Sequence, residues 1–266
     1  MNLSRPARLA LAAFMALGLA VIYIPLLLVL VNSVNTSRTF GWPPSGFTLQ
    51  WLQDALANSG VRDAVRTSVL VALGATAVAL VLGTMAAFAV SRYRFFGREA
   101  VSFVLVLPIA LPGIVTGIAL NSAFSVAGWS LGYLTVIVGH ATFCVVVVYN
   151  NVVARLRRTG TSLEEASMDL GADTFRTFRL VTMPQLRSAL LAGGLLAFAL
   201  SFDEIVVTTF TISPGLKTVP IWVFENLFRP NSAPVVNVVA AALIVLSVVP
   251  IWAAQRLSGD AAGGRL

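Results

Sequence analysis

Two adjacent carboxylates lie inside an apolar stretch of the chain, at about residues 186–211. Asp203 and Glu204 follow Ser201 and Phe202 there. A carboxylate at membrane depth costs several kcal/mol unless it is paired or hydrated, and such residues commonly mark ion or substrate pathways. The doublet therefore predicts a pathway lining that attracts a cation. The alternatives are a structural pair satisfied by a neighbouring helix, or a position near the outer headgroups.

The spacing around the doublet predicts a polar stripe on one helix. Ser201, Glu204, Thr208 and Thr211 recur at i, i+3, i+7 and i+10, which places them on the same helical face. Asp203 lies about 100° to the side of Glu204. The two carboxylates therefore need not face the same partner.

Other reactive side chains are scarce. Cys144 is the single cysteine, so neither an intramolecular disulfide nor a cysteine-based metal site is available. His140 is the single histidine, which favours a hydrogen-bonded structural histidine over a metal ligand. The sequence has no phosphate-binding G-x-x-x-x-G-K-[ST] motif and no H-E-x-x-H zinc-protease motif. We therefore expect no enzyme activity, no metal and no cofactor bound by this chain.

The composition is that of a membrane protein. Hydrophobic residues make up 58% of the 266 residues and charged residues 11%, against about 25% charged in ordinary domains. The net charge of +7 comes from arginines between apolar blocks, with a single lysine, which favours a topological signal over a nucleic-acid surface. We expect no nucleic-acid partner.

Six apolar blocks are long enough to cross a bilayer as helices, and they make one transmembrane domain over residues 1–266. The first begins like a signal peptide but is too long for one, so we expect it to be an anchor. With the N-terminus inside, thirteen of the eighteen Lys and Arg residues are cytoplasmic, which predicts that both termini are cytoplasmic. The expected spans are about 9–32, 65–90, 101–125, 131–153, 186–211 and 234–255.

Two further positions are ambiguous. Pro108 and Pro112 lie four residues apart in the third block and remove two helical donors. This predicts either a kink that shapes packing or a break that lines a cavity. Trp51 lies in the first outer loop, where an interfacial aromatic is favoured over a ligand-stacking role.

The expected cytoplasmic loop, residues 155–184, has the pattern of two short helices. Ser162 and Glu165 predict a capping box at the start of the first helix. Gly171 predicts a sharp turn, and Asp173 predicts the cap of a second helix that stops before Pro184. Such an amphipathic element could lie on the membrane or fit the groove of a partner.

The same loop resembles the EAA…G…I-x-L-P signature of bacterial ABC-importer permeases. Glu165-Ala166-Ser167 is followed after three residues by Gly171 and after nine more by Val181-Thr182-Met183-Pro184; Ser167, Val181 and Met183 depart conservatively from the signature. The resemblance implies an all-α, type I importer permease fold whose coupling helix inserts into an ATP-hydrolysing subunit. The coupling residues it implies are Glu164, Glu165, Ala166, Gly171, Ala172 and Pro184.

Four stretches, 107–117, 140–143, 201–204 and 234–238, are similar to permeases of the spermidine/putrescine type. That likeness implies that Asp203 and Glu204 take part in polyamine passage. Gly113 and Ser213 depart from residues of that family, and permeases for ferric iron, sulfate, opines or amino-acid-like solutes share the fold. The candidate pathway residues are Ser201, Asp203, Glu204, Thr208, Pro112 and Trp51.

The resemblance also implies the partners. These are a second permease in a heterodimer, two ATP-binding subunits that hold ATP and Mg²⁺, an extracytoplasmic substrate-binding protein and the lipid of a bacterial inner membrane. One alternative is a stand-alone secondary transporter, which predicts internal repeats that the sequence lacks. Another is a membrane scaffold, which leaves the acidic doublet and the prolines of the third block unexplained.

Overall fold

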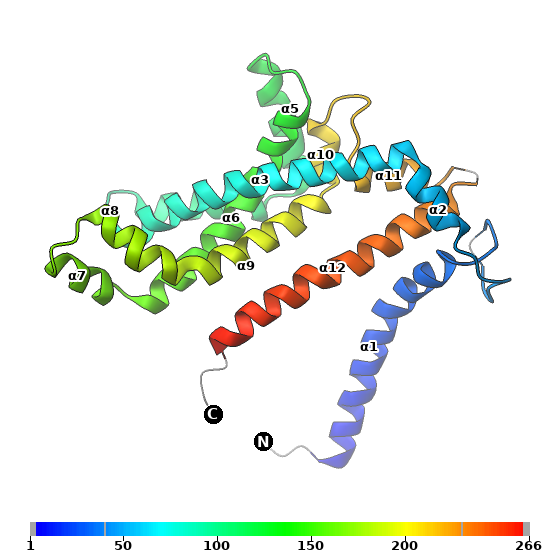
Figure 1. Cartoon of the computed structure of the whole chain (residues 1–266), viewed down its shortest axis with the longest axis horizontal. Coiled ribbons are helices and arrows are strands. Elements are labelled where there is room, and N and C mark those ends of the chain that lie inside the picture. Colours follow the sequence, from blue (N-terminus) through cyan, green and yellow to red (C-terminus); the bar gives the residue numbers. More distant parts are fainter. Residues whose placement is uncertain (1–3, 40, 230, 263–266) are drawn as a thin grey trace. The chain divides into compact units, whose positions relative to one another are not determined.

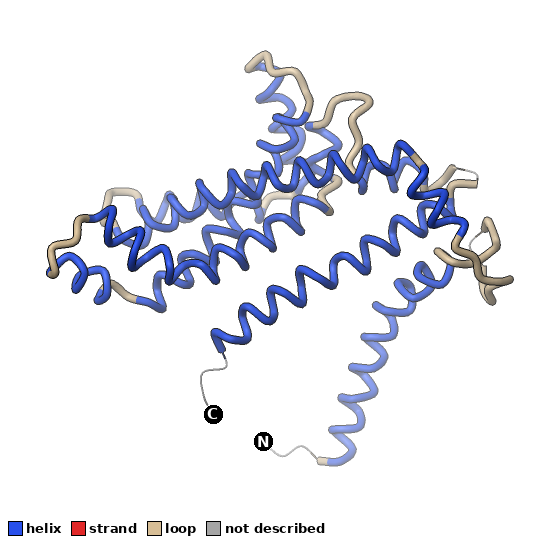
Figure 2. The backbone as a smooth tube through the Cα atoms, in the orientation of Figure 1, coloured by secondary structure: helices blue, strands red, loops and turns tan. Residues whose placement is uncertain are grey.

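The structure is a computed structural model that describes residues 4–39, 41–229 and 231–262. Within these residues the regular structure is helical, as Figure 2 shows, apart from one isolated bridge between Asn35 and Phe47. The chain ends at 1–3 and 263–266, including Arg265, lie outside the described residues. The all-α prediction is therefore confirmed for the described part of the chain.

Figure 1 labels the helices along the chain. In chain order they are α1 (Arg5–Asn32), α2 (Gln50–Ala57), α3 (Ser59–Arg92), α4 (Arg98–Ala110), α5 (Gly113–Val126), α6 (Tyr133–Thr159), α7 (Ser162–Asp169), α8 (Thr174–Thr177), the π-helical turn η1 (Phe178–Thr182), α9 (Met183–Phe202), α10 (Val206–Thr211), α11 (Val219–Asn226) and α12 (Ala233–Ala262).

Each of the six expected spans coincides largely with helix, although the third and the fifth are interrupted. Among the described residues, α1, α3, α6 and the continuous helix from α8 to α9 are long and apolar enough to cross a membrane. The pair α4 and α5 is a fifth candidate, although it is bent by 108°. α12 begins at the sixth expected span, and its part from Ala233 to Ser247 is apolar.

The chain divides into two compact units, residues 1–62 with 222–247 and residues 63–221 with 248–266. In the first unit the loop after α1 is ordered by Asn35, whose side-chain oxygen accepts hydrogen bonds from the backbone N–H of Ser37 and of Ser45, at 3.1 and 3.2 Å. The second unit contains the expected coupling loop and the acidic doublet.

The core of the second unit is formed by the close approach of α3, α6 and α9. Its buried side chains include Ala79, Val148 and Ala197. At Gly83 of α3, an added Cβ would lie 2.9 Å from the backbone oxygen of Val145. Small residues at such crossings let helix backbones pack closely, which is a main source of helix association in lipid.

Candidate functional site

The third span is broken rather than kinked. α4 ends at Ala110, and Leu111 and Pro112 are extended before α5 begins at Gly113. Leu111 precedes a proline, which disfavours the helical conformation, and Pro112 has no N–H to continue the ladder. Pro108, by contrast, lies inside α4. The structure therefore has a break at this point, and the lining of a cavity by the break stays a prediction.

The fifth span is broken as well, at residues 203–205. α9 ends at Phe202, and Asp203 is its C-cap. The Glu204 carboxylate accepts a hydrogen bond from the backbone N–H of Val207 at 2.8 Å, as a capping residue does at the start of a new helix, here α10. The prediction of one polar stripe from Ser201 to Thr211 on a single helix is therefore wrong.

The two breaks lie next to each other. An added Cβ on Gly113 would lie 3.2 Å from a side-chain carbon of Val206, the first residue of α10. On the same pair of helices, the Asn121 amide of α5 donates to the backbone oxygen of Phe210 in α10 at 2.6 Å. Residues 111–112 and 203–205 therefore interrupt two neighbouring spans at one place.

His140 of α6 connects the two sides of the fifth-span break. Its ring nitrogens Nδ1 and Nε2 lie 2.7 Å from the Ser201 hydroxyl in α9 and 2.8 Å from the Thr208 hydroxyl in α10. His140 and Thr208 are fully buried. The expected hydrogen-bonded histidine is confirmed, although the sequence did not reveal these partners.

The Thr208 hydroxyl fixes a proton on one of the two ring nitrogens. Thr208 donates its single hydroxyl proton to the backbone oxygen of Glu204 at 2.7 Å. Its oxygen must therefore accept from His140, so Nε2 carries a proton. The resulting chain of hydrogen bonds runs from α9 through His140 to the backbone of Glu204.

The candidate pathway residues have different environments. Asp203 is exposed, Glu204 is half-buried and Pro112 is exposed, whereas Ser201 and Thr208 are buried against His140. The breaks thus bring together five of the candidates, three of them with accessible surface. Free carbonyls and carboxylates at such a point can bind a cation, and irregular backbone at membrane depth is tolerated where it borders protein or a water-filled cavity.

Trp51 belongs to the first unit, on α2. Its indole N–H donates to the backbone oxygen of Asn35 at 2.7 Å, and the Arg38 guanidinium lies 5.9 Å from the ring centre. Both contacts are within residues 33–64, the expected outer loop. They give Trp51 a part in ordering that loop, and they leave the predicted pathway role untested.

The expected coupling element is formed by residues 162–182, which we call the coupling segment. Figure 1 shows it at one end of α6 and α9. α7 ends at Asp169, and Gly171 has a φ of 86°, a left-handed conformation that favours glycine. The Asp173 side chain caps α8 by accepting from the Arg176 N–H at 2.8 Å. The turn at Gly171 and the Asp173 cap are confirmed.

Two local predictions for this segment are wrong. α7 has Thr161 at its N-cap and no side-chain cap bond, so Ser162 and Glu165 form no capping box. The second helix does not stop before Pro184, because η1 joins α8 to α9. In η1 the Met183 N–H donates to the backbone oxygen of Phe178, five residues earlier. Pro184 has no N–H to donate to the helical hydrogen-bond ladder. The wider π-helical turn before it lets the chain continue into α9 without a break.

Glu164 holds the segment to the end of α3. Its carboxylate accepts from Nη2 of Arg92 at 3.0 Å and from the Thr182 hydroxyl at 3.1 Å. Arg92 also donates to the backbone oxygen of Gly160 at 2.7 Å. Glu164 therefore faces inward, whereas Glu165, Ala166 and Gly171 are exposed and Ala172 and Pro184 are half-buried. Nothing in the sequence near Glu164 indicates a partner 72 residues earlier in the chain.

Large apolar side chains remain uncovered on the coupling segment. Leu170 is 90% exposed and Phe175 is 69% exposed. Leu163 and Leu180 are also exposed. An internal bond between the Ser167 and Thr177 hydroxyls at 3.1 Å joins α7 to α8 beneath this surface. Exposed apolar groups on an ordered, internally bonded element are typical of a protein interaction site.

The comparisons with known proteins agree with this architecture. A family model described as binding-protein-dependent transport system inner membrane component matches residues 79–260, and the chain belongs to this family. It is therefore a membrane-embedded permease component of a transport system, and a multi-pass inner-membrane protein.

Particular relatives extend the likeness over nearly the whole chain. It is 34% identical to the spermidine/putrescine transport system permease protein PotC of Escherichia coli (strain K12), over 97% of each chain. It is 35% identical to the putrescine transport system permease protein PotI of the same strain, over 88% of this chain and 85% of that one.

A solved structure of a bacterial ABC transporter involved in the import of the acidic polysaccharide alginate aligns with a TM-score of 0.73 at 15% identity, over 96% of this chain and 99% of that one. This likeness concerns the fold alone. The predicted type I ABC importer permease fold is confirmed.

Proposed function

We propose that the chain is one of two permease subunits of an ATP-driven importer for polyamines such as spermidine and putrescine. The observation that carries the proposal is the meeting of two interrupted spans beside Asp203 and Glu204, in a chain of this family. Two carboxylates suit a flexible ligand with spaced ammonium groups, because charge is the main feature by which such a ligand can be recognised.

The proposed assembly contains a second, similar permease, two ATP-binding subunits and an extracytoplasmic binding protein that delivers the substrate. The chain's termini and coupling segment face the cytoplasm. The ATP-binding subunits hold ATP and Mg²⁺ and hydrolyse the nucleotide, and the coupling segment contacts them through Leu170, Phe175 and their neighbours. Closure of the ATP-binding subunits moves this segment and switches the pathway from inward- to outward-facing, as a rigid-body rearrangement.

Three features give the coupling segment a direct mechanical connection to the pathway. η1 continues into α9 without a break, and α9 ends at the fifth-span break. Glu164 ties the segment to α3 through Arg92. The hydrogen bonds of His140 tie the end of α9 to α10. A displacement of the segment is therefore transmitted along α9 to Asp203 and Glu204 without a flexible joint before the break.

Uptake of labelled spermidine and putrescine tests the proposal, in cells that carry the complete system and lack other polyamine uptake. We expect Asp203→Asn with Glu204→Gln to reduce uptake at least tenfold. The matched control is Asp63→Asn, an exposed carboxylate near the start of α3, which should leave uptake within twofold. Unlabelled sulfate, ferric iron and an opine should not compete. Competition by one of these solutes instead of a polyamine would contradict the proposed substrate class. Intact uptake in the double variant would contradict the proposed role of Asp203 and Glu204 in the pathway.

A further inference from the structure

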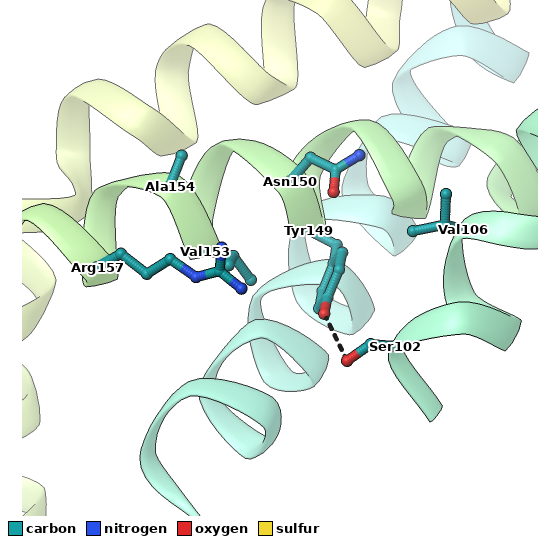
Figure 3. A pocket seen from close by; sticks show the side chains of 7 residues that line it. All are labelled: Ser102, Val106, Tyr149, Asn150, Val153, Ala154 and Arg157. Atoms are coloured by element: carbon teal, nitrogen blue, oxygen red, sulfur yellow. Dashed lines mark hydrogen bonds between the residues drawn. The ribbon is translucent and has the colours of Figure 1, made fainter. Parts of the chain in front are cut away.

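A pocket between α4 and α6, away from both breaks, has no part in the proposed transport cycle. It is lined by Ser102 and Val106 from α4 and by Tyr149, Asn150, Val153 and Arg157 from α6 (Figure 3). Its volume is about 300 Å³, at the lower end of the range for ligand pockets. It can hold a small polar group but not a whole lipid.

The free donors of the pocket are an amide and a guanidinium. Tyr149 donates its hydroxyl to Ser102 at 3.2 Å, and Ser102 donates to the backbone oxygen of Arg98 at 3.0 Å, so both hydroxyl protons are already used. Asn150 and Arg157 are exposed, and within the described ranges neither side chain makes a hydrogen bond or ion pair. The two lie seven residues apart, on one face of α6. In Figure 3 the Arg157 guanidinium extends along α6 toward Val153.

Neighbouring residues indicate that the Arg157 end of the pocket is at headgroup depth. The joint between α3 and α4 carries three exposed aromatic residues, Tyr93, Phe95 and Phe96, which is typical of a membrane interface. Arg92, at the start of this joint, donates to the backbone oxygen of Gly160, less than one turn beyond Arg157. Arg157 therefore lies near the level of the aromatic joint, and Val106 and Asn150 lie deeper in the span.

The rim of the pocket on α4 is apolar and exposed. Phe103, next to the lining residue Ser102, is 68% exposed, and the lining residue Val106 is partly exposed as well. The arrangement from one end of the pocket to the other is thus a cation, an amide donor and then an apolar surface. A phospholipid has the matching order of phosphate, ester carbonyls and acyl chains.

We propose that the pocket between α4 and α6 binds the headgroup of an anionic phospholipid from the cytoplasmic leaflet. The Arg157 guanidinium donates to the phosphate, the Asn150 amide donates to an ester carbonyl, and an acyl chain follows the surface of α4 past Phe103 and Val106. Basic pockets between transmembrane helices on the cytoplasmic side bind anionic headgroups in this way. The proposal depends on the orientation given under the proposed function, but not on the substrate.

Native mass spectrometry of the assembled transporter tests this site in micelles that contain phosphatidylglycerol or phosphatidylcholine. We expect the wild-type complex to retain phosphatidylglycerol preferentially. Arg157→Gln should reduce that retention about fivefold, since one basic residue near an anionic lipid contributes about 1 kcal/mol. Asn150→Leu should reduce retention of both lipids, because it removes the donor to the ester. Arg158→Gln is the matched control, since Arg158 is the next exposed arginine and lies outside the pocket.

Several results would overturn the proposal. Unchanged retention in Arg157→Gln, or an equal loss in Arg158→Gln, would mean that general surface charge holds the lipid. Displacement by millimolar inorganic phosphate would identify a site for a free anion. Loss of the second permease from the Arg157→Gln complex would identify a subunit contact. Lipid retention is measured without substrate or ATP, so its failure leaves the uptake result unaffected, and failed polyamine uptake leaves the lipid result unaffected.

Discussion

The coupling segment and the fifth-span break each separate two apolar helices, but they differ in which kind of side chain is buried and which is exposed. At the break, the polar side chains that connect its two sides, His140 and Thr208, are fully buried and hydrogen-bonded. On the coupling segment, apolar groups are turned outward, with Leu170 90% exposed. The first arrangement fixes an internal geometry, whereas the second leaves a surface that another protein can cover.

The comparison predicts that the coupling segment is sensitive to a change at its turn. Gly171→Asp introduces a charged side chain at a φ of 86° beside Leu170. We therefore expect uptake and ATPase stimulation to fall at least tenfold, while the amount of the chain inserted in the membrane stays normal. Gly128→Asp is the matched control, because Gly128 also has a positive φ, of 71°, and has open space where its Cβ would be. An equal loss in the control would attribute the effect to backbone strain alone.

At the break, the expected weakness is an unpaired buried group. His140→Leu leaves the Ser201 and Thr208 hydroxyls without their partner, and we expect a loss of about 1–3 kcal/mol in the free energy of unfolding. Adding Ser201→Ala and Thr208→Val should recover part of that loss, since both hydroxyls are then absent and only the backbone oxygen of Glu204 loses a donor. Denaturant titration in micelles measures both. A triple variant less stable than His140→Leu would contradict the hydrogen-bond network.

Glu164 is the exception on the coupling segment, because its carboxylate is turned inward. Glu164→Gln and Arg92→Gln should show a coupling energy of about 0.5–3 kcal/mol in a double-mutant cycle, monitored by hydrogen exchange of residues 162–182. Glu165→Gln, at the adjacent exposed position, should leave the exchange unchanged. Additive effects of the first two changes would show that the ion pair does not stabilise the segment.

The smallest expected effect concerns Trp51, in the first unit. Trp51→Phe keeps an aromatic face and removes the N–H that bonds to the Asn35 oxygen, so we expect a loss of about 0.5–1.5 kcal/mol in the stability of the outer loop. Limited proteolysis of residues 33–49 should accelerate by about two- to tenfold in consequence. Unchanged proteolysis together with lost uptake would favour the ligand-stacking role instead.

Local patterns predicted the fold well. Apolar length located the spans, Gly171 located a left-handed turn and Asp173 located a helix cap, because each depends on neighbouring residues only. The break at 203–205 was missed because hydrophobicity continues across it and because Glu204 was interpreted as part of a helical stripe. The bond from the Val207 N–H to the Glu204 carboxylate could not be expected either, because glutamate is not one of the common capping residues.

Long-range contacts could not be predicted in the same way. The bonds from His140 to Ser201 and Thr208 span more than sixty residues, and that from Arg92 to Glu164 spans 72. One sequence carries no signal that pairs these residues. The continuity of η1 with α9 was missed for a different reason, since a proline usually ends a helix and a π-helical turn that accommodates one is rare.

Site-specific cross-linking tests the central proposal most directly, which is that the coupling segment contacts an ATP-binding subunit. The native Cys144 is buried, so a new exposed cysteine can be labelled selectively. Leu170→Cys should cross-link to the ATP-binding subunit in the assembled transporter, with a yield that changes when ATP is added. Ser167→Cys, whose position faces Thr177 within the segment, should cross-link far less. Equal yields at the two positions, or no product at position 170 in an actively transporting complex, would contradict the account.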